Sequence, residues 1–352
     1  MSRYGALGAS SRLRTMQYLP ALRAAGYEVD MAPLLNDAYV RGMYAGSVSS
    51  IGVARSYIQR LRWLFSIRRY GVVWLETELL PWLPAWLELA LVPRSIRLIV
   101  DYGDAVFHRY DMHRSALVRK LLGHKIDAVM RRANLVTAGN AYLAERARKA
   151  GCVHVEWLPT VIDLQRYPVR EPDTSRDEVV VGWIGSPSTA GYLKIIAPVL
   201  TQMCKIYRVR CVAIGARPDQ VAGTPFEAMP WAEESEVALL RQFDIGIMPL
   251  RDEPWEHGKC GYKLIQYMAC SLPVIASPIG VNAELVRDGE NGYLANGASQ
   301  WAAALERLIL DRQLRMTLGV AGRRQVEEIW CLQVQAPRLV GMLSGVTRAG
   351  RP

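Results

Sequence analysis

The sequence predicts an α/β protein with two doubly wound domains, each built on a parallel sheet. Three observations predict it: near-continuous apolar strands, helical stretches between them, and a restart of this pattern near residue 179. Strands without polar alternation are typical of parallel sheets that helices cover on both faces. The chain of 352 residues is also long enough for two domains of ordinary size.

The expected strands are short runs rich in β-branched residues. They are 72–75, 98–100 and 135–137 in the first half, and 179–184, 209–214 and 245–248 in the second. Helices are expected between or beside them, for example over 11–25, 117–132, 141–150 and 299–310. This alternation indicates doubly wound sheets, which bind ligands at the carboxyl ends of their strands.

A polar segment with two prolines, 167–177, separates the halves and is typical of a linker. We therefore expect one Rossmann-like domain over 1–170, a second over 171–330, and a final helix within 331–352 that can pack back on the first domain. Only four residues precede a glycine-bearing loop at 5–8, where a Rossmann unit normally has a strand. We expect the first strand of the first domain to be missing from the sequence.

Composition excludes several classes of protein. Apolar residues make up 51% and charged residues 22%, which is typical of a globular chain. The six cysteines include no C-x-x-C pair and no zinc spacing, so a reducing, cytoplasmic compartment is expected. The sequence has no secretory signal and no run of about 18 apolar residues that would span a bilayer.

The charge is uneven along the chain. Residues 1–170 hold 24 Lys and Arg against 13 Asp and Glu, a net charge of +11, whereas 171–352 carry −1. A basic half suits an anionic membrane, a phosphorylated acceptor or nucleic acid, and a solvated basic surface is the alternative. The sequence has no RNA-binding signature, helix-turn-helix or zinc finger, so we expect no nucleic-acid partner.

The most informative segment is 256–284, where a glycine-bearing loop opens a helix near Tyr262 and a short buried strand follows. Gly258 and Gly261 allow the backbone to approach a ligand closely. The helix N-terminus offers amide donors and a positive dipole end, to which Lys259 and Lys263 add two cations. This combination suits a diphosphate. The alternative is an ordinary loop with solvated lysines.

Three stretches in this half resemble one family in order and spacing. KLIQYMACSLPVIAS, at 263–277, resembles the motif E-A-M-A-x-G-x-P-V-V-A-T of retaining glycosyltransferases of family 4, the glycosyl transferases group 1. DGENGYL, at 288–294, resembles the family's D-G-x-x-G-x-L turn, and DIGIMPL, at 244–250, the strand before its donor loop. The similarity covers roughly residues 95–345.

The resemblance implies the GT-B fold, two Rossmann-like domains facing each other across a cleft, with an N-terminal acceptor domain and a C-terminal donor domain. It implies transfer of a sugar, with retention, from a UDP- or GDP-linked donor to a hydroxyl of a glycan or lipid-linked acceptor, in surface polysaccharide or glycolipid synthesis. No cofactor and no metal are expected, because this fold neutralises the leaving diphosphate with helix dipoles and cations. Alternatives are an epimerase, a hydrolase or a non-catalytic relative that binds a sugar nucleotide.

Carried onto this sequence, the resemblance names the site residues. Candidates for binding the donor and its phosphates are Gly185, Ser186, Lys259, Gly261, Lys263, Gln266 and Glu284. A glycine loop that closes over the sugar corresponds to Gly5 and Gly8. Polar residues that face the sugar and acceptor, the catalytic candidates, are Asp101, Asp104 and His108. Asp101 and Asp104 are expected to bind hydroxyls rather than a metal ion.

Two positions depart from the family. It usually has two glutamates separated by seven residues, and this chain has Gly258 and Gln266 in their places. A glutamine can still bond a nucleotide ribose, whereas Gly258 has no side chain to hold the transferred sugar. The two departures leave the identity of the transferred sugar undetermined, and they allow the protein to be an inactive relative of the family.

An apolar, Trp-rich tract at 76–87 follows a stretch that carries Arg55, Arg60, Arg62, Arg68 and Arg69. Tryptophan and basic residues together favour a membrane interface, and burial in the core is the alternative. We expect a peripheral association with the inner membrane.

Overall fold

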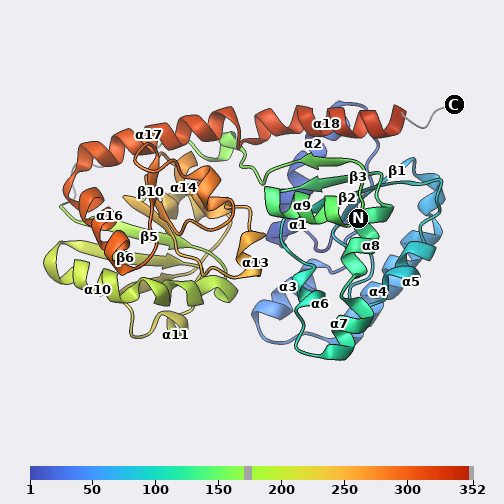
Figure 1. The fold of residues 1–352 in the computed structure, drawn as a ribbon, viewed down its shortest axis with the longest axis horizontal. Coiled ribbons are helices and arrows are strands. Elements are labelled where there is room, and N and C mark those ends of the chain that lie inside the picture. Colours follow the sequence, from blue (N-terminus) through green and yellow to red (C-terminus); the bar gives the residue numbers. More distant parts are fainter. Residues whose placement is uncertain (170–176, 349–352) are drawn as a thin grey trace. The chain divides into compact units, whose positions relative to one another are not determined.

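The computed structural model describes residues 1–169 and 177–348, so most of the expected linker lies outside the described residues. The chain divides into two compact units. Unit 1 comprises Met1–Thr160, His257–Cys260 and the C-terminal residues from Gln335; unit 2 comprises Val161–Glu256 and Gly261–Val334. The chain leaves unit 1 after Thr160, returns to it over His257–Cys260, and enters it again within α18 (Leu332–Arg348), the last helix in Figure 1.

Unit 1 is built on a parallel sheet in the order β1-β2-β3-β4. Its strands are β1 (Val72–Glu76), β2 (Arg97–Tyr102), β3 (Leu135–Ala138) and β4 (Val155–Trp157). Its helices are α1 (Ala9–Arg14), α2 (Leu19–Ala24), α3 (Asp37–Tyr44), α4 (Ser50–Phe65), α5 (Ala85–Ala90), α6 (His108–Asp111), α7 (Ala116–Leu122), α8 (Lys125–Arg132) and α9 (Ala141–Lys149). The three strands expected in this half are confirmed, and β2 is almost wholly buried because helices cover the sheet.

Two helices expected in unit 1 are broken. The stretch 117–132 forms α7 and α8, because α7 ends at Gly123, a residue that lowers helix stability. The stretch 11–25 forms α1, a 3₁₀ turn over Met16–Tyr18 and α2, and Pro20 lies in the first turn of α2. Proline is tolerated in a first turn but not in a helix interior, which is why the chain restarts there.

The first residues run beside β1. The Glu76 amide donates to the Met1 carbonyl at 3.0 Å, and the amides of Leu34 and Leu35 donate to the carbonyls of Ser2 and Arg3 at 3.0 and 2.9 Å. Residues 1–3 therefore take a strand-like place between β1 and 34–35, although the described chain has no assigned strand before β1.

Unit 2 contains a six-stranded parallel sheet in the order β10-β9-β8-β5-β6-β7. Its strands are β5 (Val179–Ile184), β6 (Val209–Ile214), β7 (Phe226–Met229), β8 (Ile245–Met248), β9 (Val274–Ala276) and β10 (Gly292–Leu294). Its helices are α10 (Ala197–Ile206), α11 (Pro218–Val221), α12 (Glu236–Leu240), α13 (Pro254–His257), α14 (Tyr262–Ala269), α15 (Asn282–Leu285), α16 (Ala298–Leu310) and α17 (Arg312–Glu328).

The strands expected at 179–184, 209–214 and 245–248 are confirmed residue for residue. From β5 the chain winds outward through β6 and β7, and from β8 it winds the other way through β9 and β10. The winding direction therefore changes between β5 and β8. A doubly wound sheet opens its ligand crevice at such a point, beyond the carboxyl ends of the strands.

One buried ion pair joins three parts of unit 1. Arg14, at the end of α1, donates to both carboxylate oxygens of Asp101 on β2, at 2.9 and 2.5 Å. Thr137 on β3 donates to the same carboxylate at 2.6 Å, and the Arg14 guanidinium also donates to the Leu158 carbonyl at 2.8 Å. Arg14 is 4% and Asp101 0% exposed, so each charge depends on the other.

We predict that Asp101→Asn destabilises unit 1 by about 3–5 kcal/mol, because it leaves the buried Arg14 charge uncompensated. The midpoint of thermal unfolding, followed by near-UV circular dichroism, measures the loss. Asp30→Asn is the matched control: Asp30 is exposed and its carboxylate accepts a 2.7 Å bond from the Tyr70 hydroxyl. A folded Asp101→Asn variant with an unchanged midpoint would return Asp101 to the hydroxyl-binding role that the sequence predicts.

Candidate functional site

In unit 2 the predicted donor residues lie around the point where the winding changes. Gly185 and Ser186 follow β5 directly and open a 3₁₀ helix over Pro187–Ile195. Gly185 is required by close packing, because a Cβ atom there would lie 2.4 Å from the Trp183 ring and 2.8 Å from Lys263 Cε. The Ser186 hydroxyl bonds the Ser188 hydroxyl at 2.8 Å, so it helps to shape this turn.

Lys263, in the first turn of α14, reaches the turn after β5. Its ammonium lies 4.9 Å from the centre of the Trp183 ring and 3.4 Å from the Thr189 hydroxyl. The structure thus brings Gly185, Ser186 and Lys263 together, as the sequence predicts for a phosphate site. A helix N-terminus beside a cation and a glycine turn is suited to bind a diphosphate.

Gly261 begins α14 in the left-handed region, with φ +66°. A Cβ atom there would lie 2.3 Å from the Leu285 side chain of α15, so the start of α14 packs tightly on α15. Glu284 is an exposed residue of the same short helix. These two predicted residues therefore lie on adjoining elements that follow β8 and β9.

Gln266 points into the core of unit 2 rather than to solvent. It is 2% exposed, and its amide donates to the Tyr167 hydroxyl at 3.3 Å. Tyr167 donates in turn to Glu236, whose other oxygen accepts a 2.7 Å bond from Trp231. The amide that replaces the family's second glutamate is thus part of a buried network.

The segment His257–Cys260 belongs to unit 1. The Asn140 amide donates to the carbonyls of His257 and Lys259 at 3.1 and 2.9 Å. A Cβ atom at Gly258 would lie 2.4 Å from that of Ala105, so no side chain fits there in this conformation. The position where the family has its first glutamate therefore has no room for a glutamate side chain in this conformation.

Glu256 lies two residues before that glycine and is 4% exposed. One of its oxygens accepts a hydrogen bond from Tyr192, and the other is buried with no hydrogen-bond partner among the described residues. The carboxylate thus lies in the protein interior, in a segment where the family has a sugar-binding acid.

The catalytic candidates of unit 1 have different surroundings. Asp101 is the buried partner of Arg14 described above. Asp104 is half-buried, and burial raises its pKa although the nearby Lys259 charge opposes the shift. His108 has both ring nitrogens engaged, one 2.9 Å from Asp111 and one 2.8 Å from the Tyr142 hydroxyl. Asp104 is therefore the catalytic candidate whose carboxylate these contacts leave available to a substrate.

The predicted sugar loop is held by α3. The amide of Leu7 donates to the Asp37 carboxylate at 2.9 Å, and a Cβ atom at Gly5 would lie 2.4 Å from the same oxygen. Gly8 is the N-cap of α1 and lies against Tyr4, 2.2 Å from a notional Cβ atom. Close packing against Tyr4 thus requires glycine at position 8, whereas a side chain at position 5 would displace the Asp37 carboxylate.

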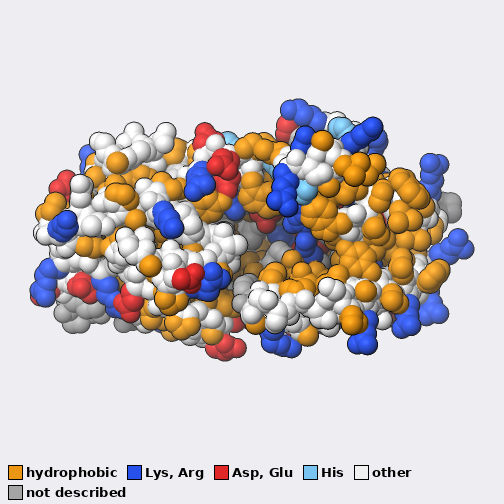
Figure 2. Space-filling view, turned by 90° about the horizontal axis from the view of Figure 1, so that it is seen from below, with side chains coloured by type: hydrophobic (Ala, Val, Ile, Leu, Met, Phe, Trp, Pro, Cys, Tyr) orange, Lys and Arg blue, Asp and Glu red, His pale blue; other side chains and the backbone are white. Residues whose placement is uncertain are grey.

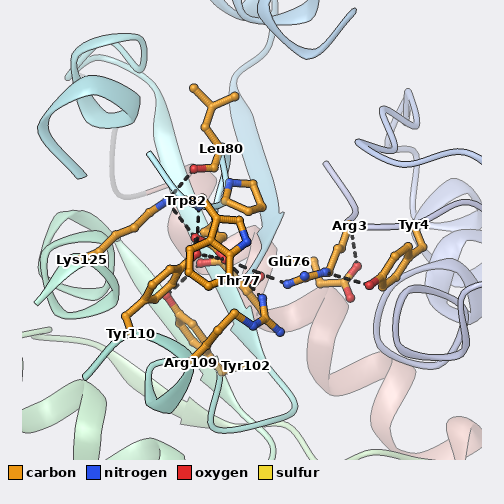
Figure 3. Close-up of polar contacts among 12 residues, drawn as sticks. Arg3, Tyr4, Glu76, Thr77, Leu80, Trp82, Tyr102, Arg109, Tyr110 and Lys125 are labelled. Carbon is orange, nitrogen blue, oxygen red and sulfur yellow. Dashed lines mark hydrogen bonds and ion pairs between the residues drawn. The ribbon is translucent and has the colours of Figure 1, made fainter. Parts of the chain in front are cut away.

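A cluster of charged residues lies where β1 ends, and sequence reasoning missed it (Figure 3). Glu78 accepts bonds from the Tyr110 hydroxyl at 3.0 and 2.7 Å, and Lys125 lies 2.8 Å from it. Arg3 and Arg109 approach the same carboxylate at 4.0 and 3.8 Å. We call these five residues the Glu78 cluster.

The signal for this cluster was present in the sequence. Glu76, Thr77 and Glu78 follow an apolar strand directly, just as Asp101 and Asp104 do. Thr77 has φ +63°, a conformation that is a genuine outlier for a β-branched residue and that clusters at functional sites.

Part of unit 2 is similar to a known protein family. Residues 179–311 match the family described as Glycosyl transferases group 1. A glycosyltransferase of Methanocaldococcus jannaschii, itself uncharacterized, is 37% identical over 91 residues, which are 25% of this chain and 24% of that protein. The matched part thus spans about a quarter of that relative.

Solved structures are similar over far more of the chain. Sucrose-phosphate synthase from Thermosynechococcus elongatus matches with a TM-score of 0.72 and 16% identity, over 99% of this chain and 96% of that one. Anabaena HepE, solved with UDP and glucose, matches with a TM-score of 0.64 and 16% identity, over 81% of both chains. The fold is GT-B, and residues 179–311 are similar to the glycosyl transferases group 1 family.

Proposed function

We propose that this protein is a glycosyltransferase that moves a sugar from a nucleoside-diphosphate donor to an acceptor hydroxyl, with retention. The observation that carries the proposal is the site at the change of winding in unit 2, where Gly185, Ser186 and Lys263 meet at the start of α14. The family match over 179–311 supports the transferase class. The UDP bound to the similar HepE supports a uridine nucleotide.

The chemistry requires stabilisation of a departing diphosphate while the acceptor hydroxyl attacks the same face of the sugar. The α14 N-terminus and Lys263 supply positive potential to the leaving group. Asp104, whose pKa is raised by burial, is our candidate for binding a hydroxyl of the sugar or acceptor. Such a site acts by positioning and electrostatics rather than by a nucleophile.

A second candidate function rests on Gly258 and Gln266. Neither position carries a carboxylate, and the Gln266 amide is committed to Tyr167. These features favour a relative that binds a sugar nucleotide without transferring the sugar. If a sugar nucleotide that binds is also turned over, the protein is a transferase. If it binds without turnover, the second function is supported.

The acceptor side is proposed to work at a membrane. Within the described residues, no helix is both long and apolar enough to cross one. On α4, however, Ile51, Ile58 and Phe65 are 68%, 52% and 85% exposed, and Arg55 and Arg62 lie between them at helical spacing. In Figure 2, hydrophobic side chains gather over the right-hand part of the view, with Lys and Arg side chains along its edge.

We call this stripe of five residues on α4 the α4 face. A helix with apolar and basic residues on one outer face suits the interface of an anionic bilayer, where each basic residue contributes about 1 kcal/mol. Trp86, 71% exposed on α5, is an aromatic residue of the kind enriched at such interfaces. A lipid-linked acceptor for a surface polysaccharide or glycolipid would be concentrated at the same surface.

Replacing Lys259 and Lys263 with Ala should weaken UDP binding at least tenfold, because a hydrogen bond to a charged group contributes about 1.5–3 kcal/mol. Isothermal titration calorimetry measures the affinity. Lys194→Ala with Lys205→Ala is the matched control, since both lysines are exposed in unit 2. Unchanged affinity in a folded double variant would exclude this site.

We expect activity to persist in EDTA, because cations and helix dipoles of the protein neutralise the leaving diphosphate. Release of UDP from a donor that binds is followed with and without the chelator. Loss of activity that manganese or magnesium restores would show that a metal ion takes part.

The protein should sediment with vesicles that contain anionic lipid, and binding should fall as salt rises, because exposed charges are screened over about 8–10 Å at physiological ionic strength. Arg55→Gln with Arg62→Gln should reduce binding, whereas Arg241→Gln with Arg324→Gln, exposed arginines of unit 2, should not. Protein that stays in the supernatant at low salt would refute the membrane proposal and favour a soluble acceptor.

A further inference from the structure

The Glu78 cluster has more hydrogen-bond donors than its carboxylate satisfies. Tyr110 and Lys125 donate to the two oxygens of Glu78 at ordinary bonding distances. Arg3 Nη1 and Arg109 Nη1 lie 4.0 and 3.8 Å from Glu78 Oε1, close enough for attraction between charges but too far for a hydrogen bond. Both Nη1 atoms are buried and have no hydrogen-bond partner among the described residues.

Lys125 also competes with Arg3 and Arg109 for the negative charge of Glu78. Lys125 is fully buried and shared between Glu78 and Glu88, the latter at 3.3 Å. Burial raises the pKa of Glu88 to about 7, so near neutral pH this carboxyl is charged only part of the time. Glu76 accepts a 2.9 Å bond from the Arg3 amide and helps to raise the pKa of Arg3, so the shortage of negative charge falls mainly on Arg109.

The two guanidiniums also lie close enough to oppose each other. The pKa of Arg109 is lowered first by burial and next by the positive charge of Arg3. Two like charges, partly removed from water and each with an unbonded N–H, are unfavourable unless an anion joins them.

Both arginines are partly accessible to solvent. The side chains of Arg3 and Arg109 are 18% and 25% exposed, so their other atoms reach the surface. Arg3 Nε donates to the Tyr4 hydroxyl at 3.1 Å, and Trp82, 48% exposed, packs on the Tyr110 ring at 5.2 Å (Figure 3). The exposed Trp82 ring, which meets Tyr110 edge to face, offers an aromatic contact to a ligand that carries an anionic group.

We propose that Arg3 and Arg109 bind a phosphate group of the acceptor. Guanidinium groups pair with phosphate through two parallel hydrogen bonds, and a tetrahedral anion can accept from two such groups at once. The inference rests on the proposed function, in which unit 1 holds the acceptor, and it names the chemical class of that acceptor as a phosphorylated compound.

The test measures the binding of inorganic phosphate to the full chain saturated with UDP, so that the donor site is already filled. Arg109→Gln and Arg3→Gln should each weaken phosphate binding at least fivefold, and Arg109→Lys, which keeps the charge, should lose less. Arg94→Gln is the matched control, because Arg94 is exposed just before β2, at the end of the sheet opposite to that where Arg109 lies. Wild-type phosphate affinity in both glutamine variants would overturn the proposal.

Folding and donor binding are followed separately. The affinity for UDP should be unchanged in Arg109→Gln, which also shows that this variant is folded. If UDP fails to bind the wild type, the proposed function fails, and phosphate binding is then measured in the Lys259→Ala, Lys263→Ala background. If phosphate binding in that background is weakened by Arg109→Gln, the phosphate site is supported although the donor site is not. If it is not weakened, the phosphate site is refuted as well.

Two further probes identify the source of the phosphate. Glycerol 3-phosphate and dihexanoyl phosphatidic acid carry the same monoester, one in a soluble compound and one in a lipid. Similar affinities would support the proposal with a soluble acceptor, and binding of the lipid at least tenfold more tightly would support it with a lipid-linked one. If Arg109→Gln weakens the binding of neither probe, the proposal is refuted.

Discussion

The arrangement of unit 1 depends on the buried pair of Arg14 and Asp101. The pair joins α1 to β2, while Thr137 and the Leu158 carbonyl tie it to β3 and to the loop after β4. The glycine loop that precedes α1 is therefore anchored at the carboxyl ends of the strands. A charge pair with no access to water tolerates little displacement, because separation leaves two uncompensated charges.

The same end of the sheet concentrates positive charge. Arg14 is matched by Asp101, but Arg3 and Arg109 share Glu78 with Lys125 and Tyr110. The Arg14 pair therefore stabilises the fold, whereas the Glu78 cluster keeps cationic donors available. Unit 1 thus holds balanced and unbalanced charges at neighbouring strand ends, and the unbalanced ones are suited to an anionic ligand.

In the described part of unit 2 the candidate site is shaped by close approaches of the backbone at glycines, not by buried ion pairs. Gly185 and Gly261 allow the turn after β5 and the start of α14 to pack against Trp183 and Leu285 without a Cβ atom. Lys263 then lies over the Trp183 ring. Gly258 makes a comparable close approach to Ala105 within unit 1, which leaves no room for a side chain at this position.

Local sequence determined six of the ten strands in the described part of the chain and the short strand after the glycine loop, because buried parallel strands are continuous apolar runs, whereas β4, β7 and β10 were not predicted. Thus 179–184, 209–214 and 245–248 could be predicted to the residue. The roles of individual polar residues could not. In the sequence, Asp101, Asp104 and His108 are equal candidates for binding a substrate. Only the tertiary structure shows that Asp101 is paired with Arg14 and that both ring nitrogens of His108 are bonded to Asp111 and Tyr142. Arg3, Glu78, Arg109 and Lys125 lie far apart along the chain, and their shared charge exists only where the end of β1 brings them together.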